Sequence, residues 1–567
     1  MFLWTSAAFA TPSKVFSYVN PKAPKGGSVH LHTLKKFDSF FPYGIQGTAA
    51  DGSDLLFATL MKTPITNLDE SFPYVALKAL PSTDFSEVTF TLNPNATFSD
   101  DSPITAEDVK FSFNLIQSKT STYKLIFQNV KSVTVLAPDK IKFSFYTPSK
   151  SFVQTLGTLP VFSHADYKRN FSESKPFFVP LSSGPYAVSK FQRPTFVAYK
   201  RLENWWGQNL PVTQGFYNFD KVHYTYYANV QTAFEAFKKG QLDLWIDQRI
   251  SSWIQNYDFP AVLQKKIKRI EFEKVYPHGL AALFFNTRKW PYDDARVRKA
   301  LTVLFDFDQI NKTYFHNQYV RLTSIFTNSP YGGPTFSDTA FCPMKAQQKL
   351  TPRDRKKCAL ALLRKAGFVF DSDTDTLLHK KGPLTLNLVV FSQNYGKLYQ
   401  NYIKTLKNIG IDASIFVGNT QSYSDKYENF DFDLILHYHP HLLNPGEEQT
   451  TFWSSKTYKD PGTLNIAGVH DPKVDDLVDK IAAMPPKNLL KQYAHQLDKI
   501  ILSSAYIIPL WAPKHVNVAF WSKFKYPEFS KDSPMDFLDH PICKQVDLLK
   551  TRKNAARYKY TTWWMAP

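Results

Sequence analysis

The segment LTLNLVVFSQNYGKLYQNYIKTLKNIGIDASIFV, residues 384–417, decides the fold class. Leu384 to Phe391 has the short apolar composition of a buried strand, and Ile411 to Val417 has it again. Between these strands, Tyr399 to Ile409 is predicted to be a helix that ends at Gly410, because glycine adopts the left-handed conformation at helix C-termini. Strand, helix and strand in this order predict a βαβ unit, and therefore a mixed α/β domain.

Elements of the same kind lie on either side of this segment. Upstream, Asp293 or Asp294 is expected to cap a helix with apolar residues at helical spacing, and a further helix is expected from Pro352 to Lys365. The first third of the chain differs, because short segments of period two predict strands there: 28–32, 88–92, 132–136 and 141–145. One helix interrupts these strands, and Thr105 with Asp108 forms a variant of the capping box at its start.

Size and composition restrict the class of protein. A chain of 567 residues exceeds a single core, so two or more domains are expected. Hydrophobic residues make up 43% and charged residues 21%, as in globular proteins, and aromatic residues reach 16%. The net charge of +19 raises the question of a nucleic-acid partner, but Lys and Arg are scattered, so no nucleic-acid binding is predicted. No window of about 18 uncharged apolar residues predicts a membrane span.

The N-terminal residues and the cysteines indicate the cellular compartment of the protein. Residues 1–10 are apolar and finish in Ala8-Phe9-Ala10, which predicts the remnant of a signal peptide with a mature chain starting near Thr11. The positively charged region of such a peptide is missing, and a buried N-terminal strand is the alternative. Of three cysteines, Cys342 and Cys358 could pair in an exported protein, or all three could be buried thiols.

Motifs for catalysis and for cofactors are missing from the sequence. It has no G-x-G-x-x-G, Walker loop, G-x-S-x-G or H-E-x-x-H, and its three S-x-x-K matches lack the partner motifs of an acyl-enzyme site. We therefore predict no enzyme activity and no cofactor. His437-Tyr-His-Pro-His441 is the most metal-like cluster, but Pro440 disturbs its alternation. A polar loop that lines a ligand site is the preferred interpretation, with no metal.

Several segments in order resemble the family-5 extracellular solute-binding proteins, which serve oligopeptide and dipeptide ABC importers. They are Phe98 to Ser112, Ser183-Gly-Pro-Tyr186, Asn204-Trp-Trp-Gly207, Ala236 to Leu244, the run from Phe285 to Ala300, Ala366-Gly-Phe368 and Leu406 to Ile411. Two further segments, Tyr18 to Gly27 and Asn444 to Trp453, are similar to the Yej-type branch, whose members are associated with peptides and with the peptide-nucleotide antibiotic microcin C. Related rhizobial members are associated with opine-like conjugates.

The resemblance implies a two-lobed periplasmic-binding-protein fold (type II, cluster C) with a subdomain inserted in lobe I. The implied division is 11–60 for the first part of lobe I, 61–195 for the inserted subdomain, 196–288 for the second part of lobe I, 289–512 for lobe II and 513–567 for the C-terminal part of lobe I. The chain is expected to cross from one lobe to the other twice, near Phe285 to Pro291 and near Ile507 to Lys514. Ligand is then expected in an interlobe cleft that closes by a hinge movement.

The implied function is that of a periplasmic substrate-binding protein, expected to be a monomer, which delivers oligopeptides or peptide conjugates to an inner-membrane ABC permease. A binder of an opine-like or sugar conjugate, and a sensor that presents ligand to a receptor, are the alternatives. Position in the family implies these ligand contacts: Gln46, Gly47 and Thr48 in lobe I, and Tyr438, His439, His441 and Trp511 in lobe II. His441 stands where relatives that bind a free amine have Asp. Two alternatives follow: Glu447 or Glu448 substitutes for that Asp, or the ligand has no free amine at this point.

Overall fold

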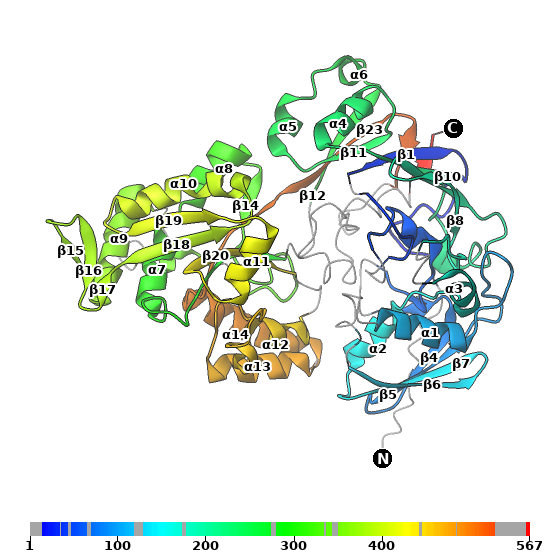
Figure 1. The fold of residues 1–567 in the computed structure, drawn as a ribbon, viewed down its shortest axis with the longest axis horizontal. Helices are drawn as coiled ribbons and strands as arrows, with labels where there is room; N and C mark the ends of the chain where they lie inside the picture. Colours follow the sequence, from blue (N-terminus) through cyan, green and yellow to red (C-terminus); the bar gives the residue numbers. More distant parts are fainter. Residues whose placement is uncertain are drawn as a thin grey trace. The chain divides into compact units, whose positions relative to one another are not determined.

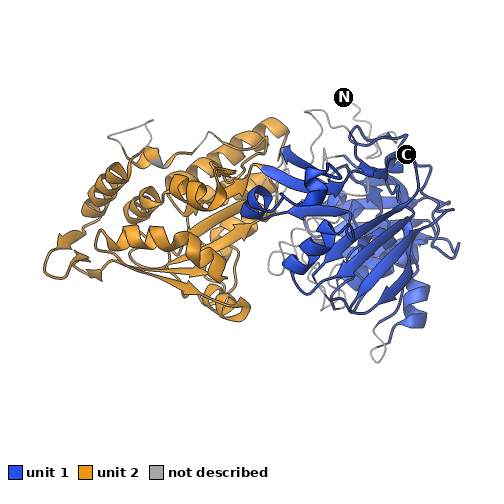
Figure 2. Cartoon of the chain, turned by 90° about the horizontal axis from the view of Figure 1, so that it is seen from above, with its two compact units in different colours: residues 1–274, 515–567 blue, residues 275–514 orange. Residues whose placement is uncertain are grey.

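The computed structural model divides the chain into two compact units (Figure 2). Unit 1 comprises Met1–Lys274 and His515–Pro567, and unit 2 comprises Val275–Lys514. The residues that the structure describes are 14–34, 36–42, 47–64, 70–117, 127, 129–172, 177–273, 279–333, 336–342, 350–440, 445–483, 485–527 and 563–566. The predicted signal-peptide remnant at 1–10 lies outside them.

In the described residues, three sheets of unit 1 have three or four strands each (Figure 1), and its other two sheets have two strands. The first has the order β1 (Ser28–Thr33), β10 (Lys221–Tyr226), β9 (Phe196–Arg201), β8 (Tyr186–Gln192), with β1 parallel to β10. The second is antiparallel, in the order β4 (Ala76–Pro81), β5 (Glu87–Leu92), β7 (Lys140–Phe145), β6 (Val130–Ala137). In the third, β23 (His515–Trp521) lies between β11 (Leu244–Asp247) and β12 (Ile267–Glu273), which brings the late part of the chain into this unit.

Local sequence signals explain the elements of unit 1. The four segments of period two form β1, β5, β6 and β7, as predicted. Helix α1 (Ala106–Ile116) begins at a reciprocal capping box between Thr105 and Asp108, and its buried apolar residues belong to the main core of unit 1. The other α-helices and strands in the described residues of unit 1 are β2 (Met61–Lys62), β3 (Phe72–Pro73), α2 (Lys150–Gly157), α3 (His164–Asn170), α4 (Val230–Lys238), α5 (Ile250–Gln255), α6 (Pro260–Leu263), β24 (Phe524–Lys525) and β25 (Trp564–Met565).

Unit 2 is a three-layer α/β structure around one five-stranded mixed sheet. The strand order is β19 (Asp412–Val417), β18 (Thr385–Val390), β20 (Leu434–His439), β13 (Leu280–Phe285), β21 (Ile507–Pro509). The predicted βαβ unit is confirmed, because β18 and β19 are parallel and α10 (Gln393–Lys407) joins them. Helix α10 begins earlier than predicted, at an N-cap on Ser392, and includes the buried Gly396.

Helices cover both faces of this sheet. Apolar residues of α7 (Ala295–Leu304), α8 (Phe307–Phe315), α9 (Pro352–Lys365) and α10 form one core with it. Those of α11 (Thr420–Glu428), α12 (Glu448–Trp453), α13 (Pro472–Ala482) and α14 (Lys487–Ser503) form the other. Two small sheets complete the unit: β14 (Tyr319–Arg321) with β22 (Trp511–Pro513), and β15 (Val369–Asp371) with β16 (Thr376–His379) and β17 (Gly382–Pro383). This layered arrangement buries both sheet faces.

The boundary of unit 2 differs from the predicted lobe II, 289–512. The unit starts at Val275, because β13 pairs with β20 on one side and with β21 on the other and therefore belongs to the sheet of unit 2. The finer division of lobe I at residues 60, 195 and 288 stays a prediction. Among the helices of the described residues, none has the length and apolar composition needed to cross a bilayer.

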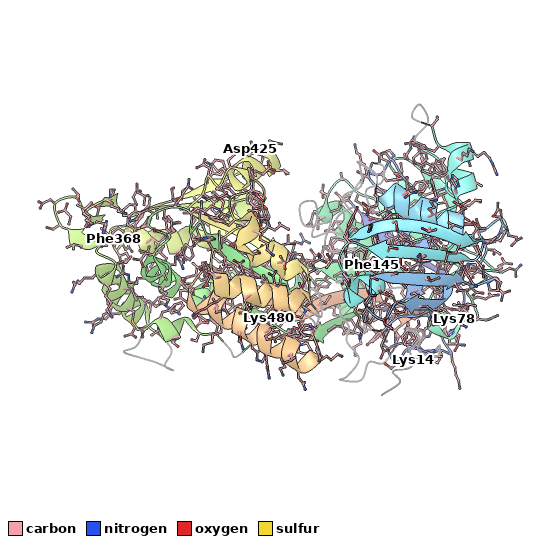
Figure 3. The ribbon with its side chains drawn as sticks, turned by 90° about the horizontal axis from the view of Figure 1, so that it is seen from below. Lys14, Lys78, Phe145, Phe368, Asp425 and Lys480 are labelled. Atoms are coloured by element: carbon pink, nitrogen blue, oxygen red, sulfur yellow. A yellow bond between two sulfur atoms is a disulfide. The ribbon has the colours of Figure 1, made fainter. Side chains whose placement is uncertain are left out.

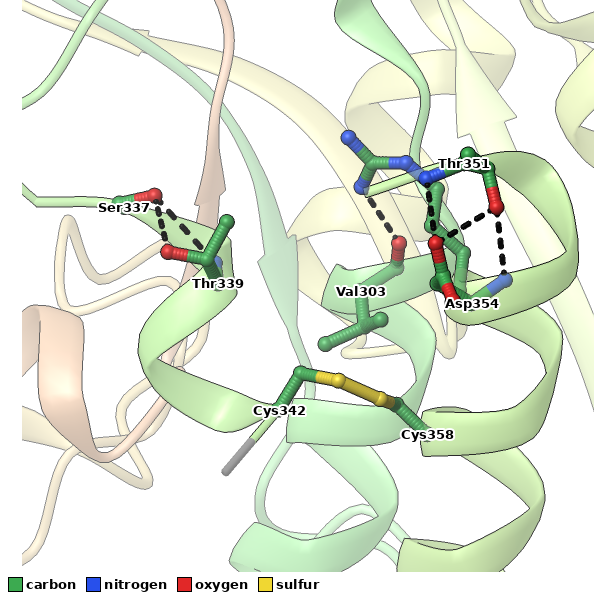
Figure 4. The surroundings of a disulfide bond; sticks show 8 residues. Val303, Ser337, Thr339, Cys342, Thr351, Asp354 and Cys358 are labelled. Atoms are coloured by element: carbon green, nitrogen blue, oxygen red, sulfur yellow. Dashed lines mark hydrogen bonds between the residues drawn. A yellow bond between two sulfur atoms is a disulfide. The ribbon is translucent and has the colours of Figure 1, made fainter. Parts of the chain in front are cut away.

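A disulfide joins Cys342 to Cys358 in unit 2 (Figure 4). The two Cα atoms lie 5.5 Å apart, and both side chains are buried. Helix α9 is fixed around this bond, because Thr351 and Asp354 form a capping box at its start and Arg355 Nη1 donates to the carbonyl of Val303 at 2.7 Å. Of the alternatives left open by the sequence, the structure therefore shows the paired one. Cys543 lies outside the described residues.

Candidate functional site

The end of β20 carries three of the polar residues singled out in the sequence. In its ladder with β13, Tyr438 lies opposite Ala281, while His437 and His439 lie opposite Ala282 and Leu280. Because side chains alternate along a strand, Tyr438 lies on the sheet face of α7 to α10, and both histidines lie on the face of α11 to α14. The two histidines and the tyrosine therefore belong to different faces.

The two histidines are packed among aromatic rings. The ring of His439 stacks on Phe452 of α12, with the centroids 4.3 Å apart, and His439 is 0% exposed. The hydroxyl of Tyr423 donates to the carbonyl of Leu436 at 2.8 Å and lies 2.9 Å from Nδ1 of His437. Burial lowers the pKa of His437 to about 4, so its ring is neutral at pH 7. His441 lies outside the described residues, and no three potential metal ligands gather elsewhere in the described chain.

The two candidate carboxylates have different surroundings. Both oxygens of Glu448 accept the backbone N–H of Gly446 at 3.1 Å, and Gln449 Nε2 donates to Oε1 at 3.0 Å. Burial raises the pKa of Glu448. Glu447 is exposed and lies at the N-cap position of α12. The carboxylate of Glu448 therefore stabilises the start of α12 through these hydrogen bonds. Glu447 is exposed to solvent instead.

Trp511 is a partly exposed member of an aromatic wall. It lies on β22, next to β21, and its ring centroid is within 6.2 Å of those of four other aromatic rings: Phe305, Phe307, Phe315 and Tyr399. Leu510, the residue before it, donates its N–H to the carbonyl of Ala281 at 2.9 Å. Ala281 is also the residue opposite Tyr438, so Tyr438 and Trp511 lie at the same end of the central sheet.

Two residues near this wall were missed in the sequence. Gly279 has φ +67°, and a Cβ placed on it would fall 2.0 Å from the hydroxyl oxygen of Tyr438, so the backbone passes directly beside that phenol. Arg321 pairs with Trp511 across the β14–β22 ladder, and its guanidinium carbon lies 5.3 Å from the Phe305 centroid. No local signal marks either residue, because both gain their meaning from strands that are distant in sequence.

Gly47 and Thr48, two of the unit 1 candidates, lie in a loop that hydrogen bonds to Asp38 hold in place. Asp38 Oδ1 accepts the N–H of Thr48 at 2.5 Å, and the carbonyl of Thr48 accepts the N–H groups of Asp38 and Ser39 at 3.0 and 3.2 Å. Gly47 has φ +53°, and its ideal Cβ would lie 2.0 Å from Asp38 Oδ1. Gly47 and Thr48 are exposed, but the backbone of Thr48 is already hydrogen-bonded within unit 1. Gln46 lies outside the described residues.

Comparison with known protein families shows which family the chain belongs to. Residues 70–460 match the model of the bacterial extracellular solute-binding proteins, family 5. The chain belongs to this family. Two relatives of this family-5 protein are a YejA protein of Escherichia coli, 30% identical over 90% of this chain and 88% of that protein, and the probable peptide-binding protein YejA of Agrobacterium fabrum, 29% identical over 92% and 90%. These matches confirm the Yej-type resemblance.

Solved structures show the fold of this family-5 protein. The oligopeptide-binding protein AppA of Bacillus subtilis, solved in complex with a nonapeptide, aligns with a TM-score of 0.66 at 16% identity, over 96% of this chain and 100% of that one. The predicted two-lobed α/β fold of a solute-binding protein is therefore confirmed. At this identity the likeness shows the fold alone, and the ligand contacts of this family-5 chain stay predictions.

Proposed function

We propose that this protein is the periplasmic substrate-binding component of an ABC importer and that it captures oligopeptides or peptide conjugates. The observation that carries the proposal is the aromatic wall at Trp511, in which a partly exposed indole packs against buried aromatic rings. This wall lies at the same end of the central sheet as Tyr438. An apolar wall with a few polar groups suits a ligand of varied side chains. The names of the A. fabrum and B. subtilis relatives support a peptide as that ligand.

The individual contacts follow from exposure and existing hydrogen bonds. We assign Trp511 and Tyr438 to the ligand surface, and Glu447 rather than Glu448 to a peptide amine, because the carboxylate of Glu448 already holds the start of α12. In unit 1, Gly47 and the side chain of Thr48 are available, whereas the backbone of Thr48 is engaged. His439 is fully buried against Phe452, so we assign it to the packing of β20 against α12. Gln46 and His441 remain candidates from family position.

Capture is proposed to involve movement of the two units. They are joined twice, at 274/275 and at 514/515, and two short connections between compact bodies are the connectivity that a hinge needs. We propose that the ligand leaves chemically unchanged, that the protein is a monomer, and that an inner-membrane permease receives the ligand. The Cys342–Cys358 disulfide supports a periplasmic location, because such bonds persist in oxidising compartments.

Native mass spectrometry of the purified protein, followed by calorimetric titration with the peptides it releases, tests this function. Intact peptides of several sequences are expected, and recovery of cleaved products would show catalysis instead. Trp511→Ala should weaken peptide affinity by roughly ten-fold or more, as expected for a central aromatic contact. Tyr146→Ala, which truncates an exposed aromatic residue of unit 1, should leave affinity unchanged. Equal affinities for the two variants would remove Trp511 from the site. A single opine-like or sugar-bearing mass would favour the conjugate alternative.

A further inference from the structure

Two neighbouring helices of unit 2 present a concentration of cationic side chains to solvent. The basic surface consists of exposed residues on α9 and α10: Arg353, Lys356, Lys357, Arg364, Lys365, Lys397, Lys404 and Lys407. Lys356 Nζ donates to the carbonyl of Asn408 at 3.3 Å, which brings the middle of α9 beside the C-terminal end of α10 (Figure 1). Within the described part of the chain, none of these eight side chains forms an ion pair.

Few carboxylates lie on the same helices to offset this charge. Asp354 is the acidic residue of α9, and its carboxylate is engaged by the N–H and hydroxyl of Thr351 in the capping box. Helix α10 has no acidic residue. Asp412, at the start of β19, is exposed and carries a carboxylate beyond the C-terminal end of α10. The two helices therefore keep a positive excess, while the turn after β15 adds the exposed carboxylates of Asp373 and Asp375 close to Phe370.

Exposed apolar side chains adjoin the basic surface. The chain leaves α9 at Gly367 and passes through Phe368, which Figure 3 labels, into the edge strand β15. In this strand Val369 is 66% exposed and Phe370 is 47% exposed. The ring of Phe370 lies at the C-terminal end of α10, because a Cβ on Gly410 would meet it at 3.0 Å. Cations and exposed apolar residues thus meet where α9, α10 and β15 come together.

We propose that this surface adsorbs to a bilayer of anionic phospholipids, with the lysines on the headgroups and Phe370, whose ring lies at the end of α10, at the acyl boundary. Lysine is depleted in protein–protein interfaces, so a surface in which lysine predominates fits lipid better than a protein partner. Basic residues beside exposed apolar ones are the composition of interfacial membrane binding. Each lysine near an anionic surface contributes roughly five-fold in affinity. Adsorption would hold the binding protein beside the membrane in which an importer lies, but it requires no permease.

Vesicle sedimentation tests the proposal. The full-length protein is mixed with vesicles of phosphatidylcholine alone or with an equal part of phosphatidylglycerol, at low and at physiological salt. The surface variant carries Gln at Lys356, Lys357, Lys404 and Lys407. The matched control carries Gln at four exposed lysines elsewhere, Lys78, Lys140, Lys491 and Lys499, so that both proteins lose the same charge.

Wild type and control should bind the anionic vesicles, and the surface variant should bind roughly ten-fold or more weakly at low salt. Phe370→Ser should weaken binding at both salt concentrations, because its contribution is apolar. If both lysine variants lost vesicle affinity equally, net charge alone would explain the effect and the proposal would be overturned. Wild type that does not bind anionic vesicles would also overturn it. Peptide affinity, measured on the same variants, should not change, so failure here is separable from failure of the proposed function.

Discussion

Asp243 provides a sharp test of what holds unit 1 together. This residue is 1% exposed, and its carboxylate accepts the N–H of His30 at 2.7 Å and Lys523 Nζ at 2.7 Å, with His30 Nδ1 at 3.1 Å. His30 belongs to β1, and Lys523 lies in the turn after β23. The carboxylate therefore ties the beginning of the chain to its late segment.

The expected cost of Asp243→Asn follows from these contacts. Removing one partner of a fully buried ion pair costs about 3–5 kcal/mol, because the other charge stays unpaired. The side chain of Lys523 is 46% exposed and that of His30 is 42% exposed, so both regain water when the carboxylate is lost. The asparagine can still accept one hydrogen bond. We therefore expect about 2–3 kcal/mol of lost stability in unit 1.

The effect should depend on pH in a definite direction. Burial raises the pKa of Asp243, but the bonds from His30 and Lys523 outweigh it and hold the pKa below its ordinary value of 3.8. The unfolded chain then binds this proton more readily than the folded one, so the stabilisation is complete above about pH 4 and is lost as pH falls through the folded pKa. The difference between wild type and variant should be constant from about pH 5 to 7 and shrink below about pH 4.

Urea unfolding read by hydrogen exchange of the β1, β11 and β23 peptides measures unit 1 separately from unit 2. The matched control is Asp220→Asn, which breaks the 2.5 Å pair with Arg201, where the Asp220 side chain is 50% exposed. It should cost less than about 1 kcal/mol. If Asp243→Asn cost no more than this control, or if the gap to wild type persisted unchanged at about pH 3, the reasoning on the buried carboxylate would be refuted.

Two further predictions concern unit 2. Replacing Cys342 and Cys358 by serine should lower the free energy of unfolding by about 3 kcal/mol, since the bond closes a loop with a sequence separation of 16, and reduced wild type should match the variant in urea unfolding. Arg288→Ala should cost about 3 kcal/mol, because Arg288 donates to the carbonyls of Tyr458, Asn465 and Ile466 with its guanidinium 4.0 Å from the Phe430 centroid. Arg288→Lys should recover only part of this in thermal unfolding, because an ammonium cannot reproduce the fork, and full recovery would contradict the assignment.

Elements with local signals could be predicted from the sequence. The capping boxes at Thr105 and Thr351 mark the starts of α1 and α9, because their hydrogen bonds join residues three positions apart. Strand β13 shows the limit of such signals. Its sequence, LAALFF, says only that it is buried, whereas its place in unit 2 depends on pairing with β20 and β21, far along the chain. The start predicted for lobe II, residue 289, therefore differs from the start of unit 2 at Val275.

The candidate site shows the same limit on a smaller scale. Alternation along β20 means that Tyr438 and His439 cannot share a face, although family position suggested both as ligand contacts. His439 is buried because Phe452 of α12 stacks on its ring. On the opposite face of the sheet, the face of Tyr438, β22 brings Trp511 to the core. Neither packing partner is adjacent in sequence. Since a side chain with no exposed surface cannot touch a ligand without displacing its cover, the geometry favours Tyr438 over its neighbour as the contact residue.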